Sequence, residues 1–274
     1  MKWPPIIERA RTIAESYDTP VTLRQLFYRL VAEQLIPNDR SSYQMLSKLT
    51  ARLREAGKFP HFIDQNRKID QFVTFDGPTD AIERLARFHY RRDRTAGQEV
   101  SLYLAVEKRG IVEQLRSWFG ELGIPIVALG GYSSVSLLRD MADAVKASRR
   151  RAILIYAGDF DPSGEGILVD FGRRGSRDFT IEQIALNEEQ VTHYRLPLGE
   201  GKPKDPRAAR FIEKHGRLMQ VELDALDPHV LRQLYADAIA RYWDDDIYTS
   251  IIEQEEAERA ELVKIAESLG TDRA

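Results

Sequence analysis

Acidic residues follow two apolar runs of the sequence, where two strands of one sheet would end. Asp159 and Asp161 come after residues 152–155 in the segment AILIYAGDFDPSG, and Glu107 comes after the run VSLYLAV. Two unit charges about 4 Å apart repel by about 4 kcal/mol at an effective dielectric near 20, so gathered carboxylates favour a bound cation. Mg²⁺ takes one or two carboxylates together with phosphate oxygens of a substrate. The pattern therefore predicts a magnesium site made by these three residues, at which Mn²⁺ is expected to substitute.

The two aspartates have a second interpretation, as ordinary residues of a turn or a helix cap. Gly158, Pro162 and Gly164 surround them, and Asp is common in such turns. The glutamate that ends an earlier strand favours the metal site over the turn. The chain has no cysteine and only five histidines, which excludes disulfides, thiolate zinc sites and cysteine nucleophiles and leaves a hard ion held by carboxylates.

Strand-like and helix-like segments alternate around these acidic residues. The expected strands are 100–108, 124–132 and 150–161, and the expected helices between them are 110–123 and 134–148. Crossovers of this length predict an α/β fold with a parallel sheet flanked by helices on both faces. Such sheets bind ligands at the carboxyl ends of their strands. Residues 180–223 are less regular and rich in turns, and 228–270 predict two C-terminal helices.

The N-terminal segment has the layout of a winged helix-turn-helix. Helices are expected at 4–17, from an N-cap at Thr22 to residues 36–38, and at 41–56, and the segment 61–75 is expected to form short strands and a turn. Residues 1–75 hold 12 Lys and Arg against 8 Asp and Glu, although the whole chain, with 40 and 43, is slightly acidic. The candidate DNA contacts are Arg29, Lys48, Arg52 and Lys108. The alternative is a small helical domain without a role on DNA.

These patterns divide the chain into a winged-helix domain at 1–76, a polar connector at 77–98 and an α/β domain with a C-terminal helical extension at 99–274. No run of about 18 apolar residues occurs, so a membrane span is not expected. The first residues, MKWPP, lack the apolar core of a signal peptide, which favours a cytoplasmic protein.

The motifs resemble the Toprim fold of topoisomerases, bacterial primases and several nucleases. More narrowly, VEKRGIVEQL, LGGYSSVSLLRDM and the D-x-D-P-x-G of residues 159–164 are similar to the A subunit of topoisomerase VI and to the related meiotic double-strand-break transesterase. Those proteins place a winged helix before the Toprim domain. The likeness covers roughly residues 20–75 and 100–225, in the same order.

A tyrosine motif extends the resemblance to the N-terminal segment. Family members carry a motif close to R-x-x-Y-Y, whose last tyrosine attacks DNA, and residues 24–28 here are RQLFY. Arg24 matches the leading arginine and Tyr28 the nucleophile, whereas Phe27 replaces the first tyrosine. A tyrosine on an amphipathic helix is otherwise a half-buried packing residue, and an arginine beside it favours the phenolate and can hold a phosphate.

The resemblance implies a type IIB topoisomerase-like, Mg²⁺-dependent DNA cleavage and rejoining enzyme. Two protomers of a homodimer would face each other across double-stranded DNA, and Tyr28 of one would form a 5′-phosphotyrosine link near the Toprim site of the other. Glu107 and Asp159 would be the principal ligands, Asp161 a ligand or a neighbour of one, and Glu107 also a general acid–base during rejoining. Lys108 would contact phosphate or lie solvated at its strand end. For Glu222 and Asp224, in VELDAL, a metal role is the weaker interpretation.

Two departures from the family shape the remaining expectations. The arm with which family members meet an ATPase looks short or missing, and no G-x-x-x-x-G-K-[ST] motif occurs, so ATP-driven strand passage would need a separate B-type subunit. The compact chain favours a stand-alone, nucleoid-associated version encoded by a phage or plasmid. A Toprim nuclease that uses water and a non-catalytic DNA-binding protein are the alternatives.

Overall fold

A four-stranded, fully parallel sheet forms the centre of the molecule. The computed structural model describes residues 2–62, 72–131, 135–175, 179–199 and 201–271. The strands run in the order β2-β1-β3-β4, and their bounds are β1 Val100–Val106, β2 Ile126–Ala128, β3 Arg151–Ala157 and β4 Phe179–Ala185. Every residue of β1 is buried, and so is β3 after its first residue, because helices cover both faces of these central strands. The expected parallel sheet flanked by helices is confirmed.

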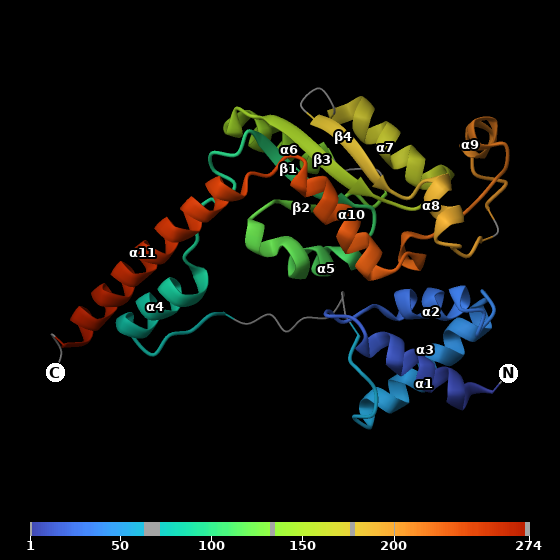
Figure 1. Ribbon diagram of the computed structural model, residues 1–274, viewed down its shortest axis with the longest axis horizontal. Coiled ribbons are helices and arrows are strands. Elements are labelled where there is room, and N and C mark those ends of the chain that lie inside the picture. The colour runs from blue at the N-terminus through green and yellow to red at the C-terminus, as the bar shows by residue number, and fades with distance from the viewer. Residues whose placement is uncertain (1, 63–71, 132–134, 176–178, 200, 272–274) are drawn as a thin grey trace.

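Two helices cover each face of the sheet (Figure 1). One face packs against α5 (Arg109–Phe119) and α10 (Pro228–Ala240), and the other against α6 (Val135–Ser148) and α7 (Pro162–Gly175). A short 3-10 helix, η2 (Gly120–Leu122), follows α5. The strand–helix order positions every loop after a strand at one edge of the sheet, which is where the predicted site residues fall.

Residues 180–223 are more regular than the sequence suggests. They complete the edge strand β4 and contain α8 (Glu188–His193), α9 (Ala208–His215) and a 3-10 helix, η4 (Leu223–Ala225). Turns and irregular segments separate these elements, as expected, but β4 was not predicted, because it carries Glu182 and Gln183 among apolar residues, as befits a half-exposed edge strand. An isolated antiparallel bridge between Phe160 and Val221 holds the end of this region against the loop after β3.

Three helices make up the N-terminal unit: α1 (Trp3–Glu15), α2 (Leu23–Ala32) and α3 (Arg40–Glu55). Thr22 caps α2, as predicted, and Gln25 completes a capping box with it. The helix ends at Ala32 rather than near residue 36, because the chain turns at Gln34, which has φ 58°. The expected wing falls largely on 63–71, outside the described residues.

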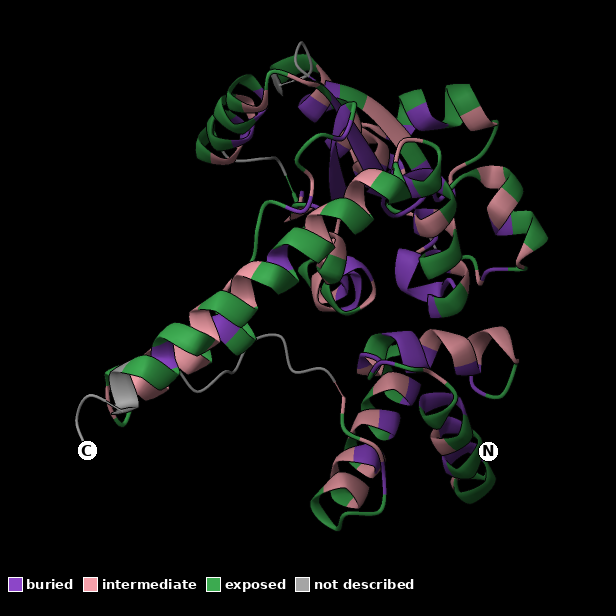
Figure 2. Cartoon of the chain, turned by 60° about the vertical axis from the view of Figure 1, so that its left-hand side comes forward, coloured by how far each residue is buried: buried purple, intermediate pink, exposed green. Residues whose placement is uncertain are grey.

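The connector and the C-terminus together build an arm that extends from the sheet (Figure 1). The helices α4 (Pro78–Arg84) and η1 (Leu85–His89) pack along the long helix α11 (Asp245–Thr271). Figure 2 shows the arm mostly exposed, whereas the sheet and the inner sides of its helices are buried. Within the described ranges, no helix combines the length and the apolarity that a membrane crossing requires.

Candidate active site

The carboxyl ends of β1 and β3 bring two of the predicted site residues into contact. Val106 and Ala157 are register partners at these ends, and the Glu107 N–H donates to the Ala157 carbonyl at 3.0 Å. The Asp159 N–H then donates to Oε2 of Glu107 at 2.8 Å. Residues more than fifty positions apart in the sequence therefore meet at one point, as the order of strands predicts.

Asp161 serves as a cap at the start of α7 beside this contact. Its Oδ1 accepts the Gly164 N–H at 2.7 Å. A Cβ on Gly164 would lie 2.2 Å from the Asp159 carbonyl oxygen and 3.2 Å from Oε2 of Glu107, so only glycine allows this approach. The cap interpretation of the D-x-D segment thus holds for Asp161, and the same geometry keeps its charge near that of Glu107.

Lys108 binds three carboxylates rather than solvent. Its Nζ lies 2.9 Å from Oδ1 of Asp159 and 3.0 Å from Oδ2 of Asp224, and it also pairs with Glu222. The Lys108 side chain is only 22% exposed, which rules out the solvated strand-end role. Burial alone would lower the pKa of Lys108, but the three carboxylates outweigh it and raise the pKa above its ordinary value.

Glu222 and Asp224 lie at the same place, although their sequence pattern indicated little role for them. The bridge between Phe160 and Val221 carries their segment to the site, where the Leu223 N–H donates to Oδ1 of Asp159 at 2.7 Å. The Asp224 side chain is 6% exposed and that of Glu222 13%. The only local signal was a pair of acids alternating with apolar residues in VELDAL. We define the acidic cluster as Glu107, Asp159, Asp161, Glu222 and Asp224.

Helix α2 contributes an arginine and the candidate tyrosine to the same place. Arg24 lies 2.6 Å from Oε2 of Glu222 through one guanidinium nitrogen and 3.5 Å from Oδ2 of Asp224 through another. The guanidinium carbon is 5.8 Å from the centre of the Tyr28 ring. Tyr28 is therefore beside the acidic cluster of its own chain, and Arg24 links the two.

The surroundings of Tyr28 shift the pKa of its hydroxyl in opposite directions. Burial raises the pKa of Tyr28 and the Glu222 carboxylate raises it further, whereas Arg24 and Lys108 lower it, and the net direction is upward. A hollow of about 460 Å³ opens beside the tyrosine, lined by Tyr28, Asn38, Pro197, Leu198, Gly199, Gln220 and Glu222. The hollow gives a ligand access to both the phenol and the edge of the acidic cluster.

Buried and half-buried polar contacts hold α2 against the sheet unit. Gln25 donates to Gln114 of α5 at 2.7 Å in a buried pair. Arg29 lies 3.1 Å from Oδ2 of Asp227, so this candidate DNA contact is engaged in an ion pair within the chain. Lys48 and Arg52 lie exposed on α3, and no contact of the described residues joins them to the acidic cluster.

Negative charge exceeds positive charge in the acidic cluster. Its five carboxylates face two cations, Arg24 and Lys108. Burial and the neighbouring Glu107 and Glu222 raise the pKa of Asp159 to about 8, although Lys108 opposes them. Burial likewise raises the pKa of Glu107. Glu222, which contacts both cations, has a lowered pKa because those contacts outweigh its burial.

The donor chemistry of this cluster fits a hard divalent cation. All five side chains offer carboxylate oxygens, and neither Glu107 nor Asp161 forms an ion pair with any described residue. Across the described residues, no three acidic or histidine side chains are already arranged as a metal-ligand group. Lys108 occupies the space between Asp159, Glu222 and Asp224, so a cation would bind on the side of Glu107, Asp159 and Asp161.

Comparison with models of known protein families gives no match, and no curated protein sequence matches the chain. The resemblance described above therefore depends on the motifs and on their order along the chain.

Proposed function

We propose that this protein is a Mg²⁺-dependent DNA transesterase of the type IIB topoisomerase A-subunit kind. The observation that carries the proposal is the contact of Arg24 with Glu222 and Asp224, which brings Tyr28 to the acidic cluster at the sheet edge. We assign the sheet unit to the Toprim fold and the three N-terminal helices to a winged helix. The motif order supports both assignments, and the parallel sheet with acids at its carboxyl ends supports the first.

The chemistry requires a nucleophile, a cationic phosphate contact and a proton donor. The Tyr28 oxygen would form a bond to phosphorus as its proton passes to solvent water, and the bond from phosphorus to the 3′ oxygen would break. The products are a 5′-phosphotyrosyl link and a free 3′-hydroxyl, so the number of phosphodiester bonds is conserved and the step is reversible. Arg24, which lies beside the phenol, would bind the phosphate and favour the phenolate.

Groups at the strand ends would give a proton to the leaving 3′ oxygen and hold the metal ion. Glu107 has a raised pKa, which suits a carboxyl group that exchanges a proton with the 3′ oxygen. Glu107, Asp159 and Asp161 would hold Mg²⁺, which when bound would neutralise phosphate charge and orient the scissile group. Lys108 would hold Asp159, Glu222 and Asp224 in place, as its ion pairs already do.

The partners follow from the same proposal. The substrate is double-stranded DNA, a homodimer provides one tyrosine for each strand, and any ATP-driven strand passage requires a separate B-type ATPase subunit. We propose a cytoplasmic, nucleoid-associated enzyme of a phage or plasmid. Exchange of Tyr28 between protomers stays a prediction, because within one chain the tyrosine already lies beside its own acidic cluster.

A search for covalent protein–DNA adducts on denaturing gels tests the proposal. The wild type is incubated with supercoiled DNA and Mg²⁺ or Mn²⁺, and the expected result is a slow-migrating adduct that Tyr28→Phe and Asp159→Ala abolish. Tyr43→Phe is the matched control, because Tyr43 is a half-buried tyrosine of α3 in ring contact with Phe27 but outside the acidic cluster. Adduct formation that survives Tyr28→Phe would refute the assignment of the nucleophile.

One observation favours a second candidate, a metal-dependent nuclease that uses water. The pKa of Tyr28 is raised, so the phenol is protonated at neutral pH in this arrangement. The nuclease predicts DNA cleavage that persists in Tyr28→Phe without an adduct and disappears in Asp159→Ala. Salt-sensitive DNA binding that is unchanged by Asp159→Ala, with no cleavage in any metal, would instead indicate a non-catalytic DNA-binding protein.

A further inference from the structure

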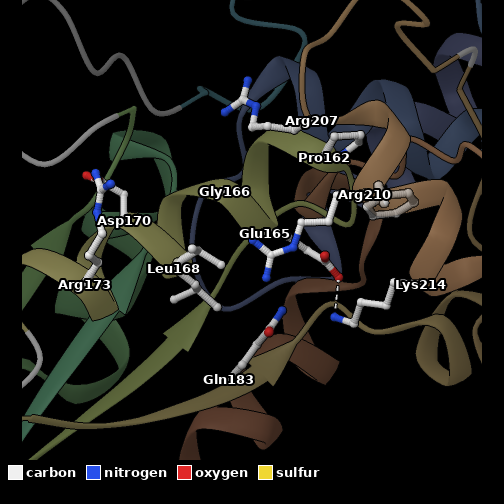
Figure 3. Close-up of a pocket in the computed structure, with 12 residues that line it drawn as sticks. Pro162, Glu165, Gly166, Leu168, Asp170, Arg173, Gln183, Arg207, Arg210 and Lys214 are labelled. Carbon is white, nitrogen blue, oxygen red and sulfur yellow. Dashed lines mark hydrogen bonds and ion pairs between the residues drawn. The ribbon is translucent and has the colours of Figure 1, made fainter.

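A pocket of about 410 Å³ lies between α7, α9 and β4. Figure 3 shows side chains from these elements converging on it. Its lining comprises Pro162, Glu165, Gly166, Leu168, Val169, Asp170, Arg173, Gln183, Arg207, Arg210, Phe211 and Lys214, and we call it the α7–α9 pocket. None of these residues belongs to the acidic cluster, so the pocket is a separate feature of the fold.

Positive side chains outnumber negative ones around the α7–α9 pocket. The four cations are Arg173, Arg207, Arg210 and Lys214, and the two acids are Glu165 and Asp170. Arg210 extends from α9 towards α7 (Figure 3), and within the part of the chain that the structure describes it forms no hydrogen bond or ion pair. A cation that points into a pocket without a protein partner favours an anionic ligand.

Both acids of the lining are already paired with cations, two of which belong to the lining itself. Glu165 accepts from Lys214 at 2.9 Å and contacts Nε2 of His215 at 2.7 Å. Burial alone would raise the pKa of Glu165, but these two contacts outweigh it and lower the pKa. Asp170 is 6% exposed and pairs with Arg173 and Arg174. The charge that remains for a ligand is therefore positive.

Gly166 lets an arginine lie across the surface of α7. A Cβ at this position would come within 3.0 Å of Cδ and of a terminal nitrogen of Arg207. Asp205 holds the same guanidinium through two contacts, at 2.8 and 2.9 Å. Arg207 is thus fixed at the rim of the pocket, on the side opposite Lys214 in the view of Figure 3.

The remaining lining suits a flat heterocycle. Leu168 and Val169 offer apolar surface, and the Val169 side chain is 50% exposed. Gln183 extends into the pocket (Figure 3), and its Nε2 donates to the Leu186 carbonyl at 3.1 Å. Its Oε1 accepts no hydrogen bond from any described residue, and so it can accept one from an exocyclic amine.

We propose that the α7–α9 pocket binds a phosphorylated small molecule of nucleoside-monophosphate size. Arg210 and Arg207 would bind the phosphate, and the base would lie over Leu168 and Val169 with its amine at Gln183. The pocket volume lies within the range of small-ligand sites. This proposal does not depend on the activity assigned to the acidic cluster.

Isothermal titration calorimetry of the full chain with AMP, adenosine and inorganic phosphate tests the proposal. We expect AMP to bind at least tenfold more tightly than adenosine or phosphate, because only AMP engages both parts of the pocket. Arg210→Glu should weaken AMP binding at least tenfold, and Gly166→Ala should also weaken it, because the added methyl group displaces Arg207. Arg217→Ala is the matched control: Arg217 follows α9, is 60% exposed and lies outside the pocket.

Three results would overturn the proposal. The first is equal affinity for AMP and adenosine, since no phosphate site would then be involved. The second is unchanged AMP affinity in Arg210→Glu, with folding of the variant checked by circular dichroism. The third is the absence of any heat with AMP while Arg210→Glu weakens binding of duplex DNA, which would assign the pocket to backbone phosphates.

Discussion

Two groups of charged side chains in this molecule differ in how fully their acids are paired with cations. The arginine cluster joins Arg94 of the connector to Glu255 of α11 at 2.7 Å and to Glu121 at 2.6 Å, and Arg259 to Glu255 at 2.6 Å. Arg91 also lies 2.7 Å from Glu121, so each glutamate of this cluster pairs with two arginines. The acidic cluster, by contrast, has five carboxylates for two cations.

The ionisation of the carboxylates follows this difference. A hydrogen bond from Arg94 lowers the pKa of Glu255, and one from Arg94 also lowers that of Glu121. Burial raises the pKa of Asp159 to about 8 and that of Glu107 as well. A cluster balanced within the chain stabilises the fold, whereas a cluster with excess charge gains stability only from a cation that the chain does not supply. The difference therefore supports a structural role for the arginine cluster and the proposed functional role for the acidic cluster.

The largest loss of stability is expected when the arginine cluster loses one of its acids. Glu255→Gln removes the charge that faces Arg94, whose side chain is 5% exposed, and should lower the free energy of unfolding by about 3–5 kcal/mol. Urea unfolding followed by circular dichroism measures it. Glu8→Gln is the control, since its pair with Arg11 is exposed and should change stability by less than about 1 kcal/mol. Equal losses of stability in the two variants would contradict a structural role of the arginine cluster.

A smaller loss of stability is expected at Gly164, which lets the start of α7 pack closely against the acidic cluster. Gly164→Ala places a methyl group 2.2 Å from the Asp159 carbonyl oxygen and forces the start of α7 away from the strand ends. We expect a loss of about 1–3 kcal/mol in the free energy of unfolding. Gly77→Ala provides the comparison, because a Cβ there meets nothing within 4 Å. A stable Gly164→Ala variant would show that the cluster tolerates looser packing.

The two clusters should respond to pH with opposite signs. The pKa of Glu255 is lowered from its ordinary value of 4.5, so this residue stabilises the fold above pH 4.5. That stability is lost as the pH falls below 4.5. The raised pKa of Asp159 means that stability is lost as the pH rises from about 4 to about 8. Each group contributes at most about 1.4 kcal/mol per pH unit.

Unfolding curves in EDTA from pH 3 to 9 separate these contributions. The stability difference between wild type and Glu255→Gln should shrink below pH 4.5, whereas Asp159→Asn should gain on the wild type as the pH rises towards 8. Parallel curves for the wild type and Asp159→Asn would contradict the excess of negative charge in the acidic cluster.

The sequence was sufficient for features that depend on local pattern. The apolar runs of β1 and β3, the N-cap at Thr22 and the acids that end two strands are set by neighbouring residues, and the structure confirms them. The strand order then brings Glu107 to Asp159 without further information.

Features that depend on distant contacts could not be predicted in the same way. Glu222 reaches the site only because Val221 bridges to Phe160, some sixty residues earlier. Lys108 is typical of a solvated strand end until those distant carboxylates surround it. The strand β4 was missed because polar residues interrupt its apolar pattern at the sheet edge.

The smallest expected effect is the stabilisation by Mg²⁺, which tests whether the acidic cluster binds a cation. At a Mg²⁺ concentration ten times its Kd, binding to the folded state should add about 1.4 kcal/mol of stability, and EDTA should remove it. Thermal unfolding with MgCl₂ and with EDTA should show this increase for the wild type and for Glu255→Gln, which leaves the acidic cluster intact, but not for Asp159→Ala. An equal increase in Asp159→Ala would place the cation elsewhere, and the excess charge would then no longer distinguish a functional site from a buried ionic network.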